Sequence, residues 1–140
     1  MLFNALFAIH TQRAIDNCRI NAYWAHSQII RATGMIKKAA VVVNYELGLI
    51  NEKCANVIRR AAEEVIEGKW NAVFLVDVYQ AGASVSFHMN ANEVNANRAI
   101  ELLGRRRGDY ALCHPNDHLN CCSPPMTFSR PRCGWQLYSD

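Results

Sequence analysis

Two amphipathic stretches, each followed by a glycine, constrain the fold of this chain more than any other feature. In residues 27–47 apolar side chains recur every three or four positions, which predicts the buried face of an α-helix. The members of this stripe are Ile29, Ala32, Ile36, Ala39, Val43 and Leu47. Residues 51–67 predict a second helix, with Asn51 as its N-cap. Gly48 and Gly68 predict the two helix ends, and the short turn between the helices predicts an antiparallel pair.

The polar residues of these two segments are expected to lie away from the core. In the first segment the residues that fall off the apolar stripe are Arg31, Lys37, Lys38 and Asn44. In the second segment the expected buried face comprises Ile58, Ala61, Val65 and Ile66. Arg59 with Glu63, and Arg60 with Glu64, have the i,i+4 spacing at which side chains pair on a helix.

The middle of the chain is less regular. The stretch "WNAVFLVDVYQ", residues 70–80, has the valine and aromatic content of a strand. A buried extended segment or a short helix fits it equally well in an all-helical setting. A third helix is predicted over residues 92–103, with an apolar side of Val94, Ala99, Leu102 and Leu103 and a stop at Gly104. The predicted fold class is therefore mainly α.

The stretch "QAGASVSFHMNANEVNANRA", residues 80–99, places asparagines, a glutamate and an arginine around a Gly/Ala/Ser loop. Asn90 or Asn92 can cap the third helix, with Glu93 in its first turn. A sharper interpretation is that backbone N–H groups of the loop and the helix start bind a carboxylate ligand. Composition alone leaves both interpretations open.

Composition and charge exclude several classes of protein. Apolar residues make up 51% of the chain, enough for a packed core, and a net charge of +3 is too small to indicate a nucleic-acid partner. The run Arg105 to Arg107 fits a turn with solvated charges. The sequence has neither an apolar run of membrane-spanning length nor the signals of a secretory leader. Its six cysteines form no CxxC pair, which favours reduced thiols in the cytoplasm.

The segment "HPNDH" offers His114 and His118 at a spacing of four residues. On a helix this spacing suits a metal ion, although no third ligand is evident in the sequence. The alternative is a polar turn in which Asn116 and Asp117 cap the backbone and the histidines face solvent or an anion.

Four blocks in order resemble the N-terminal part of the aspartase/fumarase superfamily: "HTQRAIDN", "DVYQAGASVSFHMNANEVNANRAIELLG", "GDY" and "HPNDHLN". The family text is close to QAGAGTSxNMNxNEVxANRAxExLG, followed by GDY and HPNDHVN. The likeness covers about residues 7–121. "HT" after an aromatic residue, "QAGA" and "GDY" are closer to aspartate ammonia-lyase than to fumarase.

The resemblance implies the incomplete N-terminal portion of a three-domain helical lyase fold. Members of the family are expected to form homotetramers with active sites where subunits meet. The resemblance does not imply that this chain forms such a tetramer. The implied reaction is removal of ammonia from L-aspartate to give fumarate, with no organic cofactor. For want of a third ligand, no metal is expected at His114 and His118. A base takes the C3 proton while preorganised hydrogen-bond donors hold the dianionic intermediate.

Carried over residue by residue, the family's substrate loop corresponds to Ser84, Val85, Ser86 and Asn90. The family's HPND text implies a second anion site at His114, Asn116 and Asp117. The family's serine base and partner histidine belong to later sequence, so no catalytic residue is expected in this chain.

The loop departs from the family text at three positions. Ser84 stands at a family glycine that allows backbone freedom, and His88 stands at a family asparagine. Val85 stands at the carboxylate-binding threonine, and loss of one such hydrogen bond weakens binding by about 1–3 kcal/mol. In the third helix Asn95 replaces an apolar residue and is expected to place a polar group on a packed side.

The tail "CSPPMTFSRPRCGWQ", residues 122–136, shows none of the family text expected after HPNDHVN. Permitted codons for this tail, read from the third base of the Cys122 codon, spell QSTNDVFPTAMRVA, which matches the family's next segment. Residues 1–121 are therefore interpreted as a partial N-terminal lyase domain, and residues 122–140 as an out-of-frame tail. Pro124, Pro125 and Met126 then stand where the family's Ser, Thr and Asn hold substrate.

Three functional interpretations remain. The first is aspartate ammonia-lyase, present in part, which acts on a small dicarboxylate. The second is a class II fumarate hydratase, which uses the same fold on malate. The third is a non-catalytic remnant that associates with a full-length lyase. In all three the isolated chain is expected to be inactive.

Overall fold

The computed structural model describes residues 5–80, 84–111, 113–116, 118 and 119, and the regular elements among them are helices. Its elements are α1 (Ile9–Asn17), α2 (Ser27–Glu46), α3 (Glu52–Ile66), a 3-10 turn η1 (Asn71–Val73) and α4 (Val85–Leu102). The described ranges contain no strand, only an isolated bridge between Trp24 and Asp77. The predicted mainly α class is confirmed. Asp117 and the predicted out-of-frame tail lie outside the described residues.

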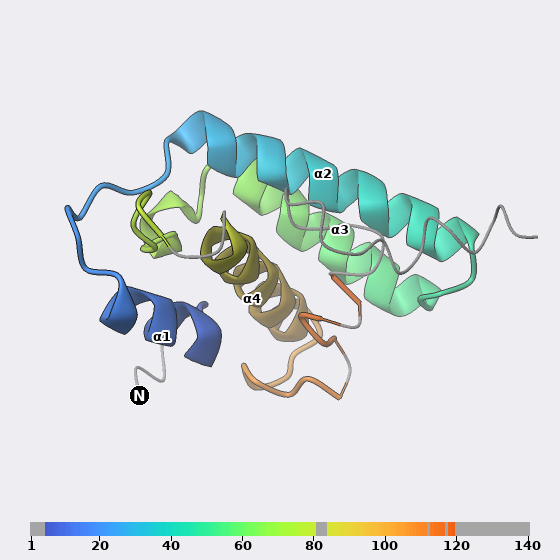
Figure 1. The fold of residues 1–140 in the computed structure, drawn as a ribbon. Coiled ribbons are helices and arrows are strands. Elements are labelled where there is room, and N and C mark those ends of the chain that lie inside the picture. The colour runs from blue at the N-terminus through green and yellow to red at the C-terminus, as the bar shows by residue number, and fades with distance from the viewer. Residues whose placement is uncertain (1–4, 81–83, 112, 117, 120–140) are drawn as a thin grey trace, which may run out of the picture.

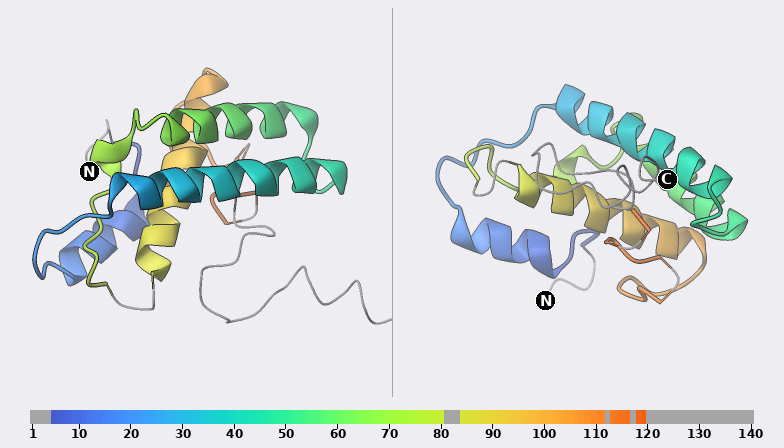
Figure 2. Two further views of the ribbon diagram at one scale, coloured as in Figure 1. Left: turned by 90° about the horizontal axis from the view of Figure 1, so that it is seen from above. Right: turned by 45° about the vertical axis from the view of Figure 1, so that its right-hand side comes forward.

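The helices α2 and α3 lie side by side and run in opposite directions, as predicted (Figures 1 and 2). The helix α4 crosses this pair, and α1 packs against α4 (Figure 1). None of the helices in the described ranges is long and apolar enough to cross a membrane.

The predicted signals at the ends of α2 and α3 are confirmed. The Asn51 side chain accepts a hydrogen bond from the backbone N–H of Cys54 at 2.8 Å, which is the N-cap geometry. Gly48 and Gly68 follow the two helices with φ of +71° and +81°. This left-handed conformation favours glycine, so both positions end a helix without strain.

The buried face of α2 differs from the predicted one. The structure buries Ile30, Gly34, Lys37, Val41 and Asn44, while all six residues of the predicted stripe are exposed. Close packing explains the difference, because a Cβ on Gly34 would lie 2.9 Å from Ile66 Cγ1 of α3. Only a residue without a side chain allows this approach, and it turns the neighbouring face inward. The expectation that Lys37 and Asn44 point away from the core is therefore wrong.

The helix α4 begins at Val85, seven positions before the predicted start, and its interior carries buried polar residues. These residues are Asn90, Asn92, Glu93, Asn95 and Asn97. The prediction that Asn90 or Asn92 caps this helix is wrong, because its N-cap is Ser84. Buried asparagines interrupt the apolar period, so the first two turns carried no helical signal in the sequence.

Contrary to the prediction, Glu93 does not lie in the first turn of α4, and its side chain instead binds the start of α1. Its carboxylate accepts hydrogen bonds from the backbone N–H groups of Ala8, His10 and Thr11 at 2.9–3.1 Å. The hydroxyl of Thr11 donates a fourth hydrogen bond at 2.6 Å. A carboxylate at a helix N-terminus is favoured by the unpaired amides and by the helix dipole. One side chain of α4 thereby caps α1.

Ion pairs tie α3 to α4 in place of the predicted pairs within α3. Arg98 donates two hydrogen bonds to the Glu64 carboxylate, at 2.6 and 2.9 Å, and its guanidinium lies over the Trp70 ring. Glu63 pairs instead with Lys38 of α2 at 2.8 Å. Both glutamates thus bind a different helix, because packing brings cations from α2 and α4 within reach.

The two adjacent isoleucines of α2 test which face is buried. Ile30 is 2% exposed and Ile29 is 53% exposed. Ile30→Ala is expected to lower the free energy of unfolding by about 2–4 kcal/mol, because the surrounding core cannot fill the space. Ile29→Ala, the matched control, is expected to change it by less than about 0.5 kcal/mol. Urea denaturation followed by circular dichroism measures both, and a larger effect at Ile29 would contradict the observed face.

Candidate functional site

The predicted substrate loop forms the start of α4. Ser84 is the N-cap, and Val85 and Ser86 are the first two residues of the helix. The backbone N–H of the next residue, Phe87, donates to the side-chain oxygen of Gln80 at 2.6 Å. Gln80 also donates to the carbonyl of Asp77 and so fixes the helix start to the preceding segment. The helix start thereby presents first-turn amides that have no acceptor within an α-helix.

Ser84 has φ of +73°, a left-handed conformation, and its side chain makes no cap hydrogen bond. The expectation that a residue with glycine-like freedom is needed here is confirmed. A serine in this conformation raises the free energy of the folded state by about 1 kcal/mol relative to glycine.

Ser84→Gly is expected to raise the free energy of unfolding by about 1 kcal/mol, because it removes this strain. Gly104 offers the mirror control, since it has φ of +72° and open space around the site of a Cβ. Gly104→Ser is expected to lower the free energy of unfolding by about the same 1 kcal/mol. Urea denaturation measures the free energy of unfolding of both variants. A lower value for Ser84→Gly would show that the backbone of Ser84 is not strained.

Asn90, the fourth residue of the predicted loop, lies in the interior of α4 and is buried. Its side-chain nitrogen donates to the Val73 carbonyl at 3.3 Å, and its side-chain oxygen has no partner among the described residues. Asn95 is also buried, and it donates to the Ala91 carbonyl one turn earlier. The predicted polar group of Asn95 on a packed side is confirmed.

The predicted second anion site forms a tight turn. The N–H of His114 donates to His118 Nδ1 at 2.8 Å, and the N–H of Asn116 donates to His114 Nδ1 at 3.2 Å. The histidines, rather than the asparagine, therefore cap this backbone. The rings of His114 and Tyr110 meet edge to face at 5.7 Å. Of the predicted anion-site residues, His114 and Asn116 fall within this turn.

These hydrogen bonds assign the neutral tautomers of both histidines. Because each Nδ1 accepts a backbone hydrogen bond, the ring proton resides on Nε2. An Nε2–H is a hydrogen-bond donor and suits an anion, whereas a metal ion needs a ring nitrogen with a lone pair. Among the described residues no group of three metal-ligating side chains gathers. In these tautomers both rings carry a donor N–H at Nε2 and no free nitrogen lone pair.

Lys37, which the sequence placed outside the core, links the two predicted sites. It is 1% exposed, and its Nζ donates to the carbonyl of Leu119 at 3.1 Å. The same Nζ lies 3.4 Å from Nε2 of His88, in the first turns of α4. Leu119 ends the described HPNDHL turn. One buried amine thus contacts both the substrate-loop helix and the second anion segment.

Burial lowers the pKa of Lys37 from 10.5 to about 7. The ammonium loses hydration in the interior, so the neutral amine is favoured there. The charge beside His88 is therefore sensitive to pH near neutrality.

The pH dependence of stability tests this buried amine. The folded pKa lies below the unfolded one, so between about pH 7 and 10.5 the unfolded chain binds more protons. The free energy of unfolding should rise over this window, by at most about 1.4 kcal/mol per pH unit. Lys37→Met, similar in size, should lose this rise. Urea denaturation from pH 6 to 10 compares the two slopes, and equal slopes would contradict a lowered pKa.

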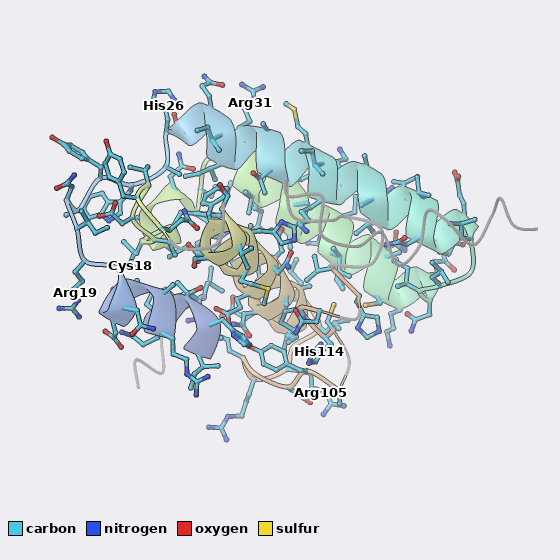
Figure 3. All side chains as sticks on the ribbon, viewed as in Figure 1. Cys18, Arg19, His26, Arg31, Arg105 and His114 are labelled. Atoms are coloured by element: carbon cyan, nitrogen blue, oxygen red, sulfur yellow. The ribbon has the colours of Figure 1, made fainter. Side chains whose placement is uncertain are left out.

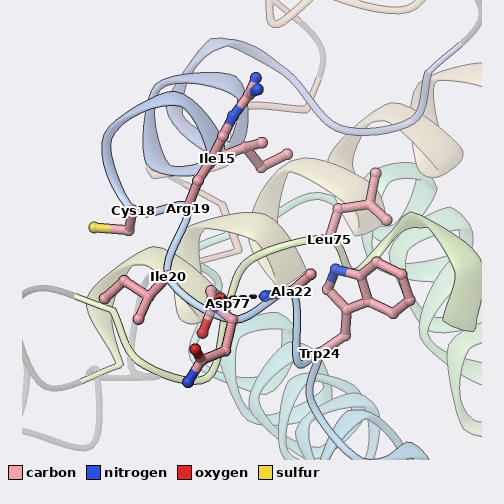
Figure 4. Close-up of a pocket in the computed structure, with 9 residues that line it drawn as sticks. Ile15, Cys18, Arg19, Ile20, Ala22, Trp24, Leu75 and Asp77 are labelled. Atoms are coloured by element: carbon pink, nitrogen blue, oxygen red, sulfur yellow. Dashed lines mark hydrogen bonds between the residues drawn. The ribbon is translucent and has the colours of Figure 1, made fainter.

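A cavity of about 530 Å³ lies elsewhere in the described part of the chain (Figure 4). It is bounded by the end of α1, the following turn and the segment around Asp77. The Asp77 carboxylate accepts hydrogen bonds from the N–H groups of Asn21, Ala22 and Tyr79, at 2.9 Å each. These hydrogen bonds, that of Asn21 first, lower the pKa of Asp77.

Asp77 therefore connects the turn after α1 to the segment that precedes α4. It stabilises Ala22 in a left-handed conformation, with φ of 55°. Cys18 and Arg19, which line this cavity, lie at the left edge of the molecule in Figure 3, whereas His114 lies near its lower middle. None of the predicted site residues that the structure describes borders the cavity.

Comparison with known proteins gives concordant matches. The sequence model of a family described as Lyase matches residues 3–124. An aspartate ammonia-lyase from a Bacillus species is 46% identical over 117 residues, which make up 84% of this chain and 25% of that protein. A class II fumarate hydratase from Halobacterium salinarum is 48% identical over 117 residues, with the same coverage. The chain thus spans about a quarter of the length of these curated relatives.

Solved structures agree. The crystal structure of a fumarate lyase:delta crystallin from Brucella melitensis, bound to cobalt, superposes with a TM-score of 0.82 at 44% identity. The match covers 86% of this chain and 26% of that one. A class II fumarase from Schistosoma mansoni superposes with a TM-score of 0.81 at 31% identity, also over 86% of this chain.

Proposed function

Because the chain belongs to the Lyase family, we propose that it supplies the carboxylate-binding part of an aspartate ammonia-lyase. The start of α4, with Ser84, Val85 and Ser86, binds one carboxylate of L-aspartate, and Asn90 supports this turn from inside the helix. The turn with His114, Asn116 and Asp117 binds a second anion. The base that removes the C3 proton lies outside these residues.

The single observation that carries this proposal is the position of Lys37. It contacts His88 on the substrate-loop helix and Leu119 beside the anion turn. Two segments that the family text assigns to anion binding are thus linked by one buried amine. Backbone amides fixed in this way need no reorganisation when charge develops on a bound carboxylate.

The geometry fits the chemistry of ammonia removal. The C3 proton of aspartate leaves first, and the resulting carbanion delocalises into the neighbouring carboxylate. The C2–N bond then breaks, and its electron pair leaves with the nitrogen while the C2–C3 double bond of fumarate forms. First-turn amides at the start of α4 are suited to the additional negative charge on the carboxylate.

Fumarate hydratase is the second candidate, and the 48% identity to the Halobacterium salinarum protein favours it. Fumarate is common to both reactions, so the same carboxylate donors serve either one. The text "QAGA" and "GDY" favours ammonia-lyase. We place the protein in the cytoplasm on the reduced state expected of its thiols.

The assembly is also part of the proposal. The exposed apolar side chains of α2 suit a segment that packs against further lyase sequence or against a second subunit. These side chains include Ile29, Ile36, Val43 and Leu47.

A chimera tests the function. The aligned 117 residues of the Bacillus aspartate ammonia-lyase are replaced with those of this chain. The chimera should deaminate aspartate with a kcat/KM about 10–100-fold below that of the host, because Val85 lacks a hydroxyl donor. Val85→Thr in the chimera should recover about tenfold, since one hydrogen bond to a charged group is restored. Fumarate formation is followed by its ultraviolet absorbance.

Val42→Thr, the same change at an exposed valine of α2, is the matched control and should leave kcat/KM unchanged. A chimera that hydrates fumarate but does not deaminate aspartate would establish the second candidate. Equal effects of Val85→Thr and Val42→Thr on kcat/KM would contradict a role of Val85 in substrate binding. The 140-residue chain alone should form no fumarate, because it carries no catalytic base.

A further inference from the structure

Two cysteines from distant parts of the chain lie in contact. Cys54 Sγ and Cys113 Sγ are 3.2 Å apart, within hydrogen-bond distance for sulfur, and neither is in a disulfide. Cys54 belongs to the first turn of α3, and Cys113 directly precedes His114. The sulfurs need to approach by only about 1 Å to reach disulfide bonding distance.

Cys54 lines a cavity of about 240 Å³. The residues that line this cavity are Asn51, Lys53, Cys54, Leu103 and Arg105. The cavity wall thus carries two cationic side chains, those of Lys53 and Arg105, and lies at the N-terminus of α3. Such surroundings stabilise a thiolate, which is the nucleophilic form of cysteine.

The two thiols differ in character. Cys113 is fully buried and does not line this cavity, whereas Cys54, at 3% exposure, does. The hydrogen bond between them lowers the pKa of Cys54 and raises that of Cys113. Burial raises the pKa of Cys113 further. The geometry thus gives Cys54 the role of attacking thiolate and Cys113 that of a second, protonated thiol.

We propose that Cys54 and Cys113 form a redox-active dithiol that a small hydroperoxide oxidises to a disulfide. The Cys54 thiolate attacks the terminal oxygen of the hydroperoxide. The O–O bond breaks, an S–O bond forms, and the alkoxide leaves as the alcohol after taking up a proton. Sulfur has then lost two electrons, and Cys54 is a sulfenic acid.

The second step closes the disulfide. The sulfur of Cys113 attacks the sulfur of Cys54, the S–O bond breaks and the S–S bond forms. Water leaves with the proton of Cys113. In sum, two thiols and one hydroperoxide give one disulfide, one alcohol and one water.

The disulfide would tie the start of α3 to the segment that begins the anion turn. Figure 3 shows Arg105, on the cavity wall, at the same end of the molecule as His114. Oxidation therefore fixes the backbone next to His114. This consequence for the anion turn rests on the proposed function, whereas the dithiol chemistry does not.

The test uses the 140-residue chain with Cys18, Cys121, Cys122 and Cys133 replaced by serine. Cumene hydroperoxide should convert the remaining thiols into one intramolecular disulfide, found by peptide mass mapping as a link between Cys54 and Cys113. Dithiothreitol should reverse it. Treatment in guanidinium chloride is the control, because unfolding separates the sulfurs and should abolish preferential formation of the link.

Single variants separate the two roles. Cys113→Ser should stop at a sulfenic acid on Cys54, trapped by dimedone, whereas Cys54→Ser should leave Cys113 unmodified. Circular dichroism checks that each variant keeps its helices.

The exposed pair Lys53 and Arg105 offers a test that does not alter the core. Replacing both with glutamine should slow oxidation by about threefold or more, because the thiolate loses its cations. Two unmodified thiols in the folded chain, or equal oxidation rates folded and unfolded, would overturn the proposal. Either result would leave the proposed carboxylate site intact, because the chimera tests that site separately.

Discussion

The hydrogen bonds of the buried Glu93 carboxylate are the interaction on which the arrangement of the helices depends. The helices α1, α2 and α3 all contact α4. Glu93 lies in the middle of α4 and is 1% exposed. A buried carboxylate is stable only when hydrogen bonds replace its lost hydration. Here three backbone amides and the Thr11 hydroxyl, from more than 80 residues earlier in the chain, supply these bonds. Glu93, at the centre of α4, thereby determines where the start of α1 packs against α4.

The same helix is held near its two ends by other polar contacts. Gln80 accepts from the Phe87 N–H at the start of α4, and Arg98 pairs with Glu64 of α3 near its end. Lys37 then reaches from α2 to His88 and to Leu119. A helix fixed in this way presents its first-turn amides in a constant position. The proposed carboxylate site is therefore a consequence of how a polar helix is buried, rather than of a mobile loop.

The sequence predicted the helices whose apolar period is uninterrupted. The bounds of α2 and α3 agree with the prediction within one residue at each end, because Asn51, Gly48 and Gly68 have direct local effects on the backbone. The buried face of α2 was missed because it includes Lys37 and Asn44, whereas the exposed face carries the more regular apolar stripe. Gly34 decides between them through a contact with α3 that exists only in the folded state.

The site residues that belong to the family motif could be predicted from the sequence. Those whose position depends on tertiary packing could not. Ser84 was identified from its place in the family text, and its left-handed backbone supports that reading. The role of Lys37 was missed because a lysine is usually exposed. A signal was nevertheless present, since Ile30, Gly34, Lys37, Val41 and Asn44 recur at alternating intervals of four and three residues. This spacing is a helical face, and it includes the lysine.

The most direct test of the carboxylate site is a titration of the ¹⁵N-labelled 140-residue chain with succinate, followed by nuclear magnetic resonance. Succinate carries the two carboxylates of the proposed substrate and undergoes no reaction. The account predicts that the amide signals of Val85 and Ser86 shift saturably, and that Lys37→Met reduces these shifts. Shifts confined to Arg19 and Trp24, at the cavity beside Asp77, or no saturable shift at the start of α4, would contradict it.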